Sequence, residues 1–178
     1  MRFATIAALF ALCTSLALGQ ASQKLPASPP AQATLTIPGG EIQIKYSAPA
    51  VRGRQIFGPG GLLSHDATYP VWRAGANAAT SLHTDADLML GSLRVPKGDY
   101  TLFVLVSDPD HWQLIVNRQT GQWGLTYDAK RDLGRVPMEM SAPPAPIERL
   151  KYVLTGHSLS LQWDRHIGTV PLRIGSSR

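Results

Sequence analysis

The chain has 178 residues, enough for one domain that buries roughly 70% of its unfolded surface, and its 17 basic and 12 acidic residues give a net charge of +5. The basic residues are scattered and form no run, which argues against nucleic acid as a partner. The single cysteine, Cys13, lies in an apolar N-terminal stretch. The remainder of the chain therefore contains no side chain for a disulfide, a thiolate nucleophile or a cysteine metal site.

The first 19 residues have the pattern of a signal peptide. Arg2 precedes an apolar run over residues 3–18, and small residues occupy the −3 and −1 positions of a cleavage site after Gly19. An uncleaved anchor, or a lipoprotein modified at Cys13, is the alternative. No other segment approaches the roughly 20 apolar residues of a membrane span. We expect a periplasmic or secreted protein whose mature form has no transmembrane span.

A short tether is expected to follow. Residues 20–32 contain three prolines among small and polar residues, a composition typical of flexible or extended linkers. The folded domain is expected over residues 33–178.

From residue 33 onward the pattern is that of short strands. Residues 41–47 alternate polar and apolar side chains, and residues 88–95 form a hairpin around Gly91. Residues 98–107 read as a central buried strand, and further strands are expected at 112–116, 158–163 and 167–174, the last at a sheet edge because of Pro171. The one helical candidate is a single turn at 128–133. These elements predict an all-β fold, a single antiparallel β-sandwich, jelly-roll-like or similar, with little helix.

The most distinctive stretch is residues 71–80, which combines a Trp, an Arg, a Gly, an Asn and a Thr. Its polar side chains suit a ligand pocket with an indole wall, and two arginines upstream could join it, since guanidinium groups bind carboxylate, phosphate or sugar hydroxyls. The predicted ligand-binding residues are Arg52, Arg54, Trp72, Arg73, Asn77 and Thr80. In the structural alternative, the Trp fills the core, Gly75 turns the chain, the Asn bonds backbone and the Arg pairs with a carboxylate.

Metal binding and catalysis have weaker support. His83, Asp85 and Asp87 would share one strand face and offer one nitrogen and two oxygen ligands for zinc or manganese. The same residues are equally good turn sequence, so we expect no metal and no other cofactor. The serines lack a Gly-x-Ser-x-Gly elbow, and the adjacent residues of Ser64-His65-Asp66 cannot form a relay, which is built from separated segments.

The tryptophans could form a sugar-binding platform, but two of them fit the core better. Trp112 and Trp163 are in phase with buried Leu and Val positions, whereas Trp123 lies between Gln122 and Gly124 and is the best exposed aromatic residue.

Several segments together resemble a known family. Residues 46–58 (YSAPAVRGRQIFG), 71–80 (VWRAGANAAT), 93–103 (LRVPKGDYTLF) and 112–117 with Gln122-Trp123-Gly124 resemble the motifs of domain-of-unknown-function family 2911, of secreted or periplasmic bacterial proteins. The resemblance spans about residues 35–174 and implies a small β-rich extracytoplasmic domain without an assigned activity. Ala78 stands where the family usually has an acidic residue, and residues 59–69 are longer and richer in glycine than usual.

These observations favour a binding module for a small polar or anionic ligand over an enzyme. The alternatives are a hydrolase-type enzyme, with or without a metal, and a structural protein of the envelope. The sequence predicts no particular oligomeric state.

Overall fold

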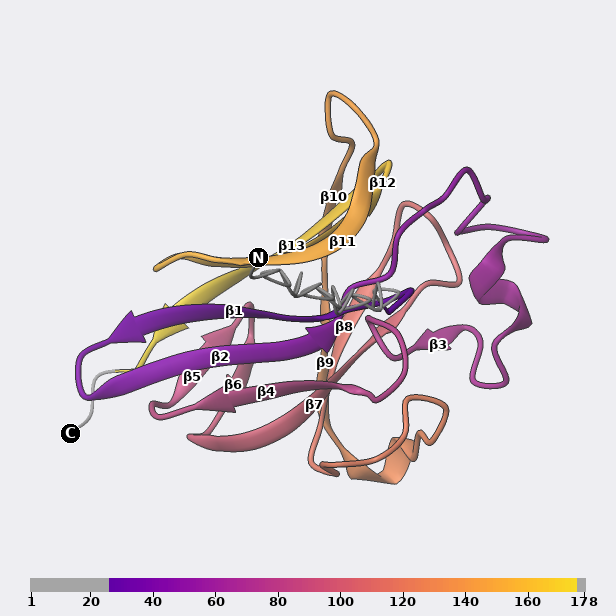
Figure 1. The fold of residues 1–178 in the computed structure, drawn as a ribbon. Coiled ribbons are helices and arrows are strands. Elements are labelled where there is room, and N and C mark those ends of the chain that lie inside the picture. Colours follow the sequence, from indigo (N-terminus) through magenta and orange to yellow (C-terminus); the bar gives the residue numbers. More distant parts are fainter. Residues whose placement is uncertain (1–25, 176–178) are drawn as a thin grey trace, which may run out of the picture.

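The computed structural model describes residues 26–175, and these form two antiparallel β-sheets packed face to face (Figure 1). The predicted all-β sandwich is confirmed. The expected signal peptide and residues 20–25 of the expected tether lie outside the described residues.

The first sheet has the strand order β1-β2-β4-β7-β8-β9, with the short β3 also paired to β7. Its strands are β1 (Pro30–Ile37), β2 (Gly40–Ser47), β3 (Val71–Trp72), β4 (Thr80–Thr84), β7 (Gly98–Leu105), β8 (Gln113–Asn117) and β9 (Asp132–Pro137).

The second sheet has the order β11-β12-β13-β5-β6, with β10 paired to β13. Its strands are β5 (Leu88–Leu90), β6 (Leu93–Val95), β10 (Glu139–Ser141), β11 (Ile147–Leu154), β12 (Ser158–Asp164) and β13 (His166–Ile174). Two short 3₁₀ helices complete the fold, η1 (Leu62–His65) and η2 (Ala129–Arg131), and the second lies inside the expected turn at 128–133.

Side-chain alternation explains the core. In β2, Ile42 and Ile44 are fully buried between the sheets while Gln43 and Lys45 point outward. In β7 the alternation of buried and exposed side chains is lost, because Phe103 on the outer face is also buried. It packs in a second small cluster with Val71 and Ile115. Burial on both faces makes β7 nearly continuous in apolar residues.

The placement of Pro171 at a sheet edge is wrong. β13 pairs with β12 along one side over most of its length. Along the other side it pairs first with β10, up to Thr169, and then with β5, from Leu172. Pro171 lies at the changeover between these two partners, where a residue without an N–H removes no ladder hydrogen bond.

The domain begins earlier than expected. β1 starts at Pro30, which pairs with Ser47, so residues 30–32 belong to the sheet and not to the tether. The preceding turn is also fastened, since the N–H of Ala48 donates to the carbonyl of Pro29.

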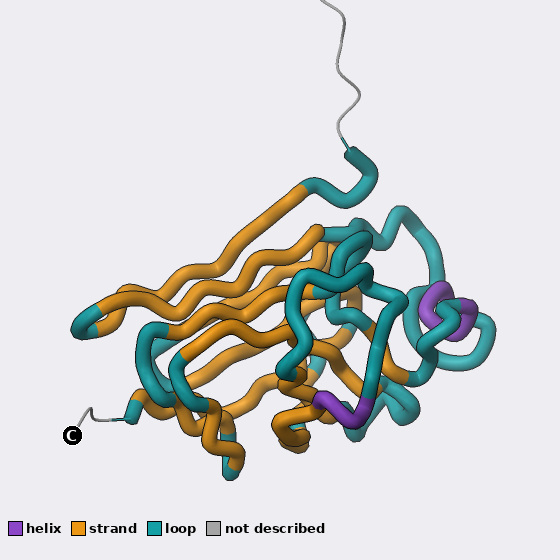
Figure 2. The backbone as a smooth tube through the Cα atoms, turned by 90° about the horizontal axis from the view of Figure 1, so that it is seen from below, coloured by secondary structure: helices purple, strands orange, loops and turns teal. Residues whose placement is uncertain are grey.

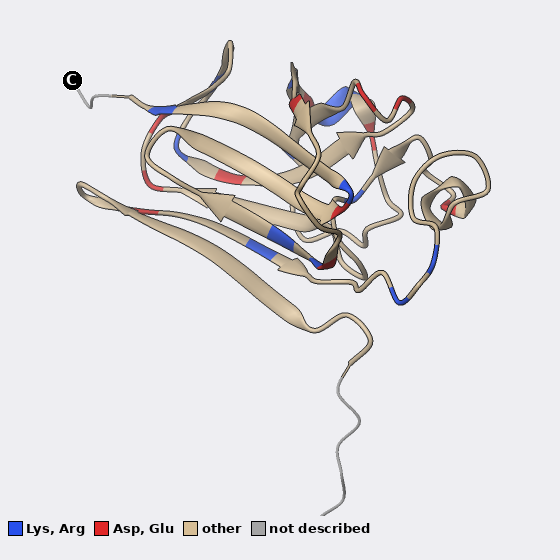
Figure 3. Cartoon of the chain, turned by 90° about the horizontal axis from the view of Figure 1, so that it is seen from above, with Lys and Arg blue, Asp and Glu red and all other residues tan. Residues whose placement is uncertain are grey.

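The two ends of the sandwich differ. The long loop between β2 and β3, with η1, lies at the end opposite the tight β1–β2 turn (Figures 1 and 2). Lys and Arg residues are dispersed over the fold and interspersed with Asp and Glu (Figure 3). Within residues 26–175, no helix has the length and apolar character that a membrane crossing requires.

Candidate functional site

Trp72 is part of the core. The pairing of β3 with β7 carries its indole between the sheets, where it is 2% exposed and stacks on Trp163 with ring centroids 5.6 Å apart. Its Nε1–H donates to the carbonyl of Gly75 at 3.0 Å. Trp72 therefore supports the following turn from its buried side and does not form an exposed stacking wall.

The turn after Trp72 has an unusual backbone. Ala74 and Asn77 adopt left-handed conformations, with φ of 54° and 61°, which non-glycine residues rarely take. Gly75 has another role: a Cβ there would lie 2.9 Å from the Thr80 hydroxyl oxygen, so the turn needs a residue without a side chain. The chain therefore turns tightly at Arg73–Asn77. The residues in left-handed conformations are Ala74 and Asn77, and Gly75 is not one of them.

Buried hydrogen bonds hold this turn. The carbonyl of Ala74 accepts from the hydroxyls of Thr80, at 3.1 Å, and Tyr152, at 2.9 Å. Burial raises the pKa of Tyr152, so its hydroxyl stays a donor. Thr80 is fully buried and is a structural residue, whereas Asn77 is exposed and its carbonyl accepts from the N–H of Gly124.

Arg73 and Arg54 meet at a small recess beside the turn. Because the distinctive stretch 71–80 contributes Arg73, we call that stretch the signature and the recess the signature recess. The NH1 group of Arg73 forms an ion pair of 2.9 Å with Asp66, and both side chains are largely buried. Arg54 is fixed by the carbonyls of Val51 and Ala50, which accept from its Nε and NH2. The recess has a volume of about 140 Å³ and is lined by Ser28, Pro49, Arg54, Leu62, Leu63, Asp66, Arg73, Gly75, Ala76 and Trp163.

The backbone of Gly124 packs directly against Arg73. A Cβ on Gly124 would lie 1.9 Å from Arg73 Cδ and 2.4 Å from the carbonyl oxygen of Asn77. The Nε of Arg73 is buried here and has no hydrogen-bond partner among the described residues. The loop at 122–124 thus holds the stem of Arg73 in place.

Arg52 belongs to a different contact. Its backbone N–H donates to Glu148 at 2.9 Å, and its NH2 donates to the carbonyl of Ala27 at 3.1 Å. It fastens the start of the described chain to β11 and does not line the recess.

Two of the six predicted residues, Arg54 and Arg73, therefore come together at the recess. Trp72 and Thr80 are buried beneath the turn. Arg52 and Asn77 are exposed and lie outside the recess. Sequence reasoning missed Asp66 and Trp163 as recess residues. Asp66 lies in the long loop, where its sequence context gave no signal, and Trp163 reaches the recess from the edge of the core.

All the residues that line the recess lie within the part of the chain that a family model matches. The family model described as a protein of unknown function (DUF2911) matches residues 28–172. The chain belongs to this family. In this DUF2911 protein, the distinctive stretch 71–80 supplies Arg73, Gly75 and Ala76 to the recess. No significant match was found among the curated proteins or among the solved structures.

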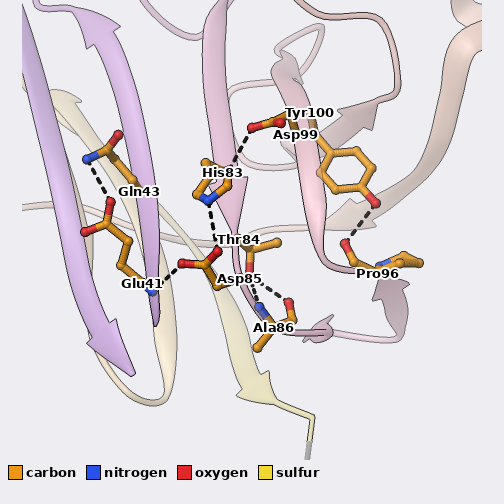
Figure 4. A network of polar contacts seen from close by, with 9 residues as sticks. All are labelled: Glu41, Gln43, His83, Thr84, Asp85, Ala86, Pro96, Asp99 and Tyr100. Carbon is orange, nitrogen blue, oxygen red and sulfur yellow. Dashed lines mark hydrogen bonds and ion pairs between the residues drawn. The ribbon is translucent and has the colours of Figure 1, made fainter. Parts of the chain in front are cut away.

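A second polar cluster surrounds His83 on the outer face of the first sheet (Figure 4). His83 Nδ1 lies 2.8 Å from Asp99, its cross-strand neighbour on β7, and Nε2 lies 3.3 Å from Asp85. The hydrogen bond to Asp99 is the main cause that raises the pKa of His83. The N–H of Glu41 donates to Asp85 at 2.8 Å and is the main cause that lowers the pKa of that carboxyl.

The weak metal-ligand set His83, Asp85 and Asp87 is not assembled. β4 ends at Thr84, so the period-two alternation stops and Asp87 turns away. Its carboxylate instead accepts from Arg94 at 2.7 Å and from the N–H of Lys97 at 3.0 Å. Over residues 26–175, no group of three or more His, Cys, Asp or Glu side chains has a geometry that could hold a metal ion.

The His83 cluster predicts a pH dependence of stability. Because folding raises the pKa of His83, its contribution is complete below the unfolded value near 6.5 and is lost as the pH rises through the folded value. The free energy of unfolding of the wild type should therefore decrease across this range relative to His83→Gln, in urea melts at a series of pH values. His157→Gln, at an exposed histidine, is the control and should follow the wild type. Parallel curves for His83→Gln and the wild type would contradict the assignment.

Proposed function

We propose that this DUF2911 protein is an exported, non-catalytic binding module, and that its recess accepts a small anionic group such as a carboxylate or a phosphate. The observation that carries the proposal is the charge of the recess, whose lining contains two arginines and a single carboxylate, that of Asp66. The expected signal peptide supports export, with Gln20 as the first residue of the mature chain.

Both arginines are held in advance of binding. Carbonyl oxygens fix Arg54, and Asp66 together with the loop at Gly124 fixes Arg73. Arginine presents several N–H groups in a rigid fork that matches carboxylate and phosphate oxygens. Because the guanidinium groups are already positioned, an incoming anion loses less conformational entropy on their side.

The size and walls of the recess restrict the ligand to one functional group. Its volume of about 140 Å³ is smaller than the roughly 300–1,000 Å³ of pockets for drug-sized ligands. Leu62, Leu63 and Trp163 supply apolar walls, which lower the local dielectric and strengthen a charge-assisted hydrogen bond. Ala74, between the lining residues Arg73 and Gly75, has a left-handed backbone conformation, a strained state of the kind found at binding sites.

A binding role is favoured over a catalytic one by the state of the carboxylate. Asp66 is engaged in an ion pair with Arg73, which suits it to orient a guanidinium and opposes its use as a general base.

The test is calorimetric titration with inorganic phosphate and with acetate, using glycerol as an uncharged probe. Arg73→Gln and Arg54→Gln should each weaken anion binding by about tenfold or more, the loss of one charge-assisted hydrogen bond. Asp66→Asn should have the opposite effect and strengthen binding, because it removes the competing carboxylate.

Lys45→Gln removes a charge from the exposed face of β2 and is the matched control, which should bind as the wild type does. The proposal is wrong if neither anion binds, or if Asp66→Asn and Arg73→Gln change the affinity in the same direction.

A further inference from the structure

A larger cavity lies at the opposite end of the sandwich from the recess at Arg54 and Arg73. It is an open cavity of about 610 Å³, lined by Pro38, Gly39, Asp85, Ala86, Asp87, Leu88, Met89, Arg94, Lys97 and Gly175. These residues come from the β1–β2 turn, the segment from β4 to β6, the turn after β6 and the end of β13, and none is among the predicted ligand-binding residues. A volume of this size accommodates a drug-sized ligand.

The acidic groups of the cavity are already occupied. Both oxygens of Asp87 accept hydrogen bonds, one from Arg94 and one from the N–H of Lys97. Both oxygens of Asp85 are also engaged, one by the N–H of Glu41 and the other by His83. A cationic ligand would have to share these carboxylates with the donors that already bind them.

The basic groups of the cavity keep free hydrogen-bonding capacity. Arg94 is 73% exposed and donates to Asp87 through NH2, which leaves its other N–H groups for a ligand. The ammonium group of Lys97 forms no ion pair within residues 26–175, and the contact of Lys97 with Asp87 is made by its backbone N–H. The hydrogen bond to Asp87 is the main cause that raises the pKa of Arg94.

Apolar side chains lie directly beside these cations. Met89 on β5 points outward and is the cross-strand partner of Arg94 on one side and of Arg173 on the other. Opposed residues of neighbouring strands share a face of the sheet, so a methionine lies between two exposed arginines.

We propose that this cavity binds an amphipathic anion, a single carboxylate or phosphate group joined to an aliphatic chain. The anionic group contacts Arg94 and Lys97, and the chain lies over Met89 toward Pro38. Among the lining residues Arg94 and Lys97 balance Asp85 and Asp87, and Arg173, the cross-strand neighbour of Met89 outside the lining, adds a further positive charge beside the cavity. This site is independent of the signature recess, and either can fail without the other.

The test uses octanoate as the probe, with octan-1-ol and octylamine as chain-matched neutral and cationic compounds, followed by NMR chemical-shift titration of the purified protein. Octanoate should bind at least about tenfold more tightly than octan-1-ol, and the shifted resonances should include Met89 and Lys97. Lys97→Gln, which keeps the backbone contact to Asp87, and Arg173→Gln should weaken octanoate binding severalfold. Lys130→Gln, on η2, should leave it unchanged.

Flotation with vesicles of phosphatidylcholine, with and without phosphatidylglycerol, distinguishes the source of the ligand. Association with the anionic vesicles that is lost in Lys97→Gln identifies a lipid headgroup, and octanoate binding without vesicle association identifies a free amphipathic acid. The proposal is overturned if octanoate does not bind, if octan-1-ol or octylamine binds as tightly, or if Lys97→Gln with Arg173→Gln binds octanoate as the wild type does.

Discussion

Replacement of Trp72 by Ala should lower the free energy of unfolding by about 3–5 kcal/mol, the usual cost of removing a buried aromatic side chain. The indole is 2% exposed and packs on Trp163 and, edge to face, on Phe57. The substitution also removes the Nε1–H donor to the carbonyl of Gly75, a buried contact beneath the signature turn. Urea denaturation followed by far-UV circular dichroism measures the loss.

Trp123→Ala is the matched control. This indole is 57% exposed, and its strand-like contact with Ala78 is made by the backbone, so the free energy of unfolding should change by only about 0.5 kcal/mol. If Trp72→Ala fails to fold, Trp72→Phe keeps an aromatic ring and should fold with a smaller loss. Equal costs for Trp72→Ala and Trp123→Ala would contradict the assignment of Trp72 to the core.

Long periodic segments were predictable from the sequence. The alternation in residues 41–47 marks β2, and the hairpin around Gly91 appears as β5 and β6. The apolar run at 98–107 contains β7, because Phe103 is covered on the outer face as well. The predicted burial of Trp112 and Trp163 and the predicted exposure of Trp123 are confirmed.

Short elements and partner exchange were not predictable in this way. β3 has only two residues, too few to show a period, so the role of Trp72 remained open. Pro171 was predicted to lie on an edge strand because it lacks a backbone N–H. In the structure β13 changes its partner from β10 to β5 at this point, so the missing N–H is tolerated in an interior strand. The predicted metal set needed a strand that continued to Asp87, but β4 ends at Thr84.

The candidate site shows the same limit. The signature indicated Arg73, but its carboxylate partner Asp66 lies in a loop without periodicity, and only the folded chain brings the two together. The 610 Å³ cavity is assembled from four separated segments, each of which reads locally as a turn or a strand end. Local patterns predict which face of a strand is buried, but they do not predict which turns meet at an end of the sandwich.

Replacement of Gly124 by Ala should destabilise the protein by about 2–3 kcal/mol and weaken anion binding at the signature recess. The added Cβ would overlap Arg73 Cδ, at 1.9 Å, and the carbonyl oxygen of Asn77, at 2.4 Å. A side chain can shift, but the Asn77 carbonyl belongs to a backbone that accepts the N–H of Gly124 itself, so the cost falls in the upper part of the range for overpacking. Thermal and urea melts, with phosphate titration of the same variant, measure both effects.

Gly156→Ala isolates the steric cause. A Cβ at Gly156 meets no atom within 4 Å, so this substitution should change the free energy of unfolding by only about 0.5 kcal/mol. Gly124→Ala introduced into Arg73→Ala then separates the two overlaps, since the shortened side chain removes Cδ and leaves only the Asn77 carbonyl. A smaller loss in the free energy of unfolding in the Arg73→Ala background shows that Gly124 is required to leave room for the Arg73 side chain. An unchanged cost assigns the requirement to the backbone contact alone, in which case the loop at 122–124 supports the turn and does not position the guanidinium.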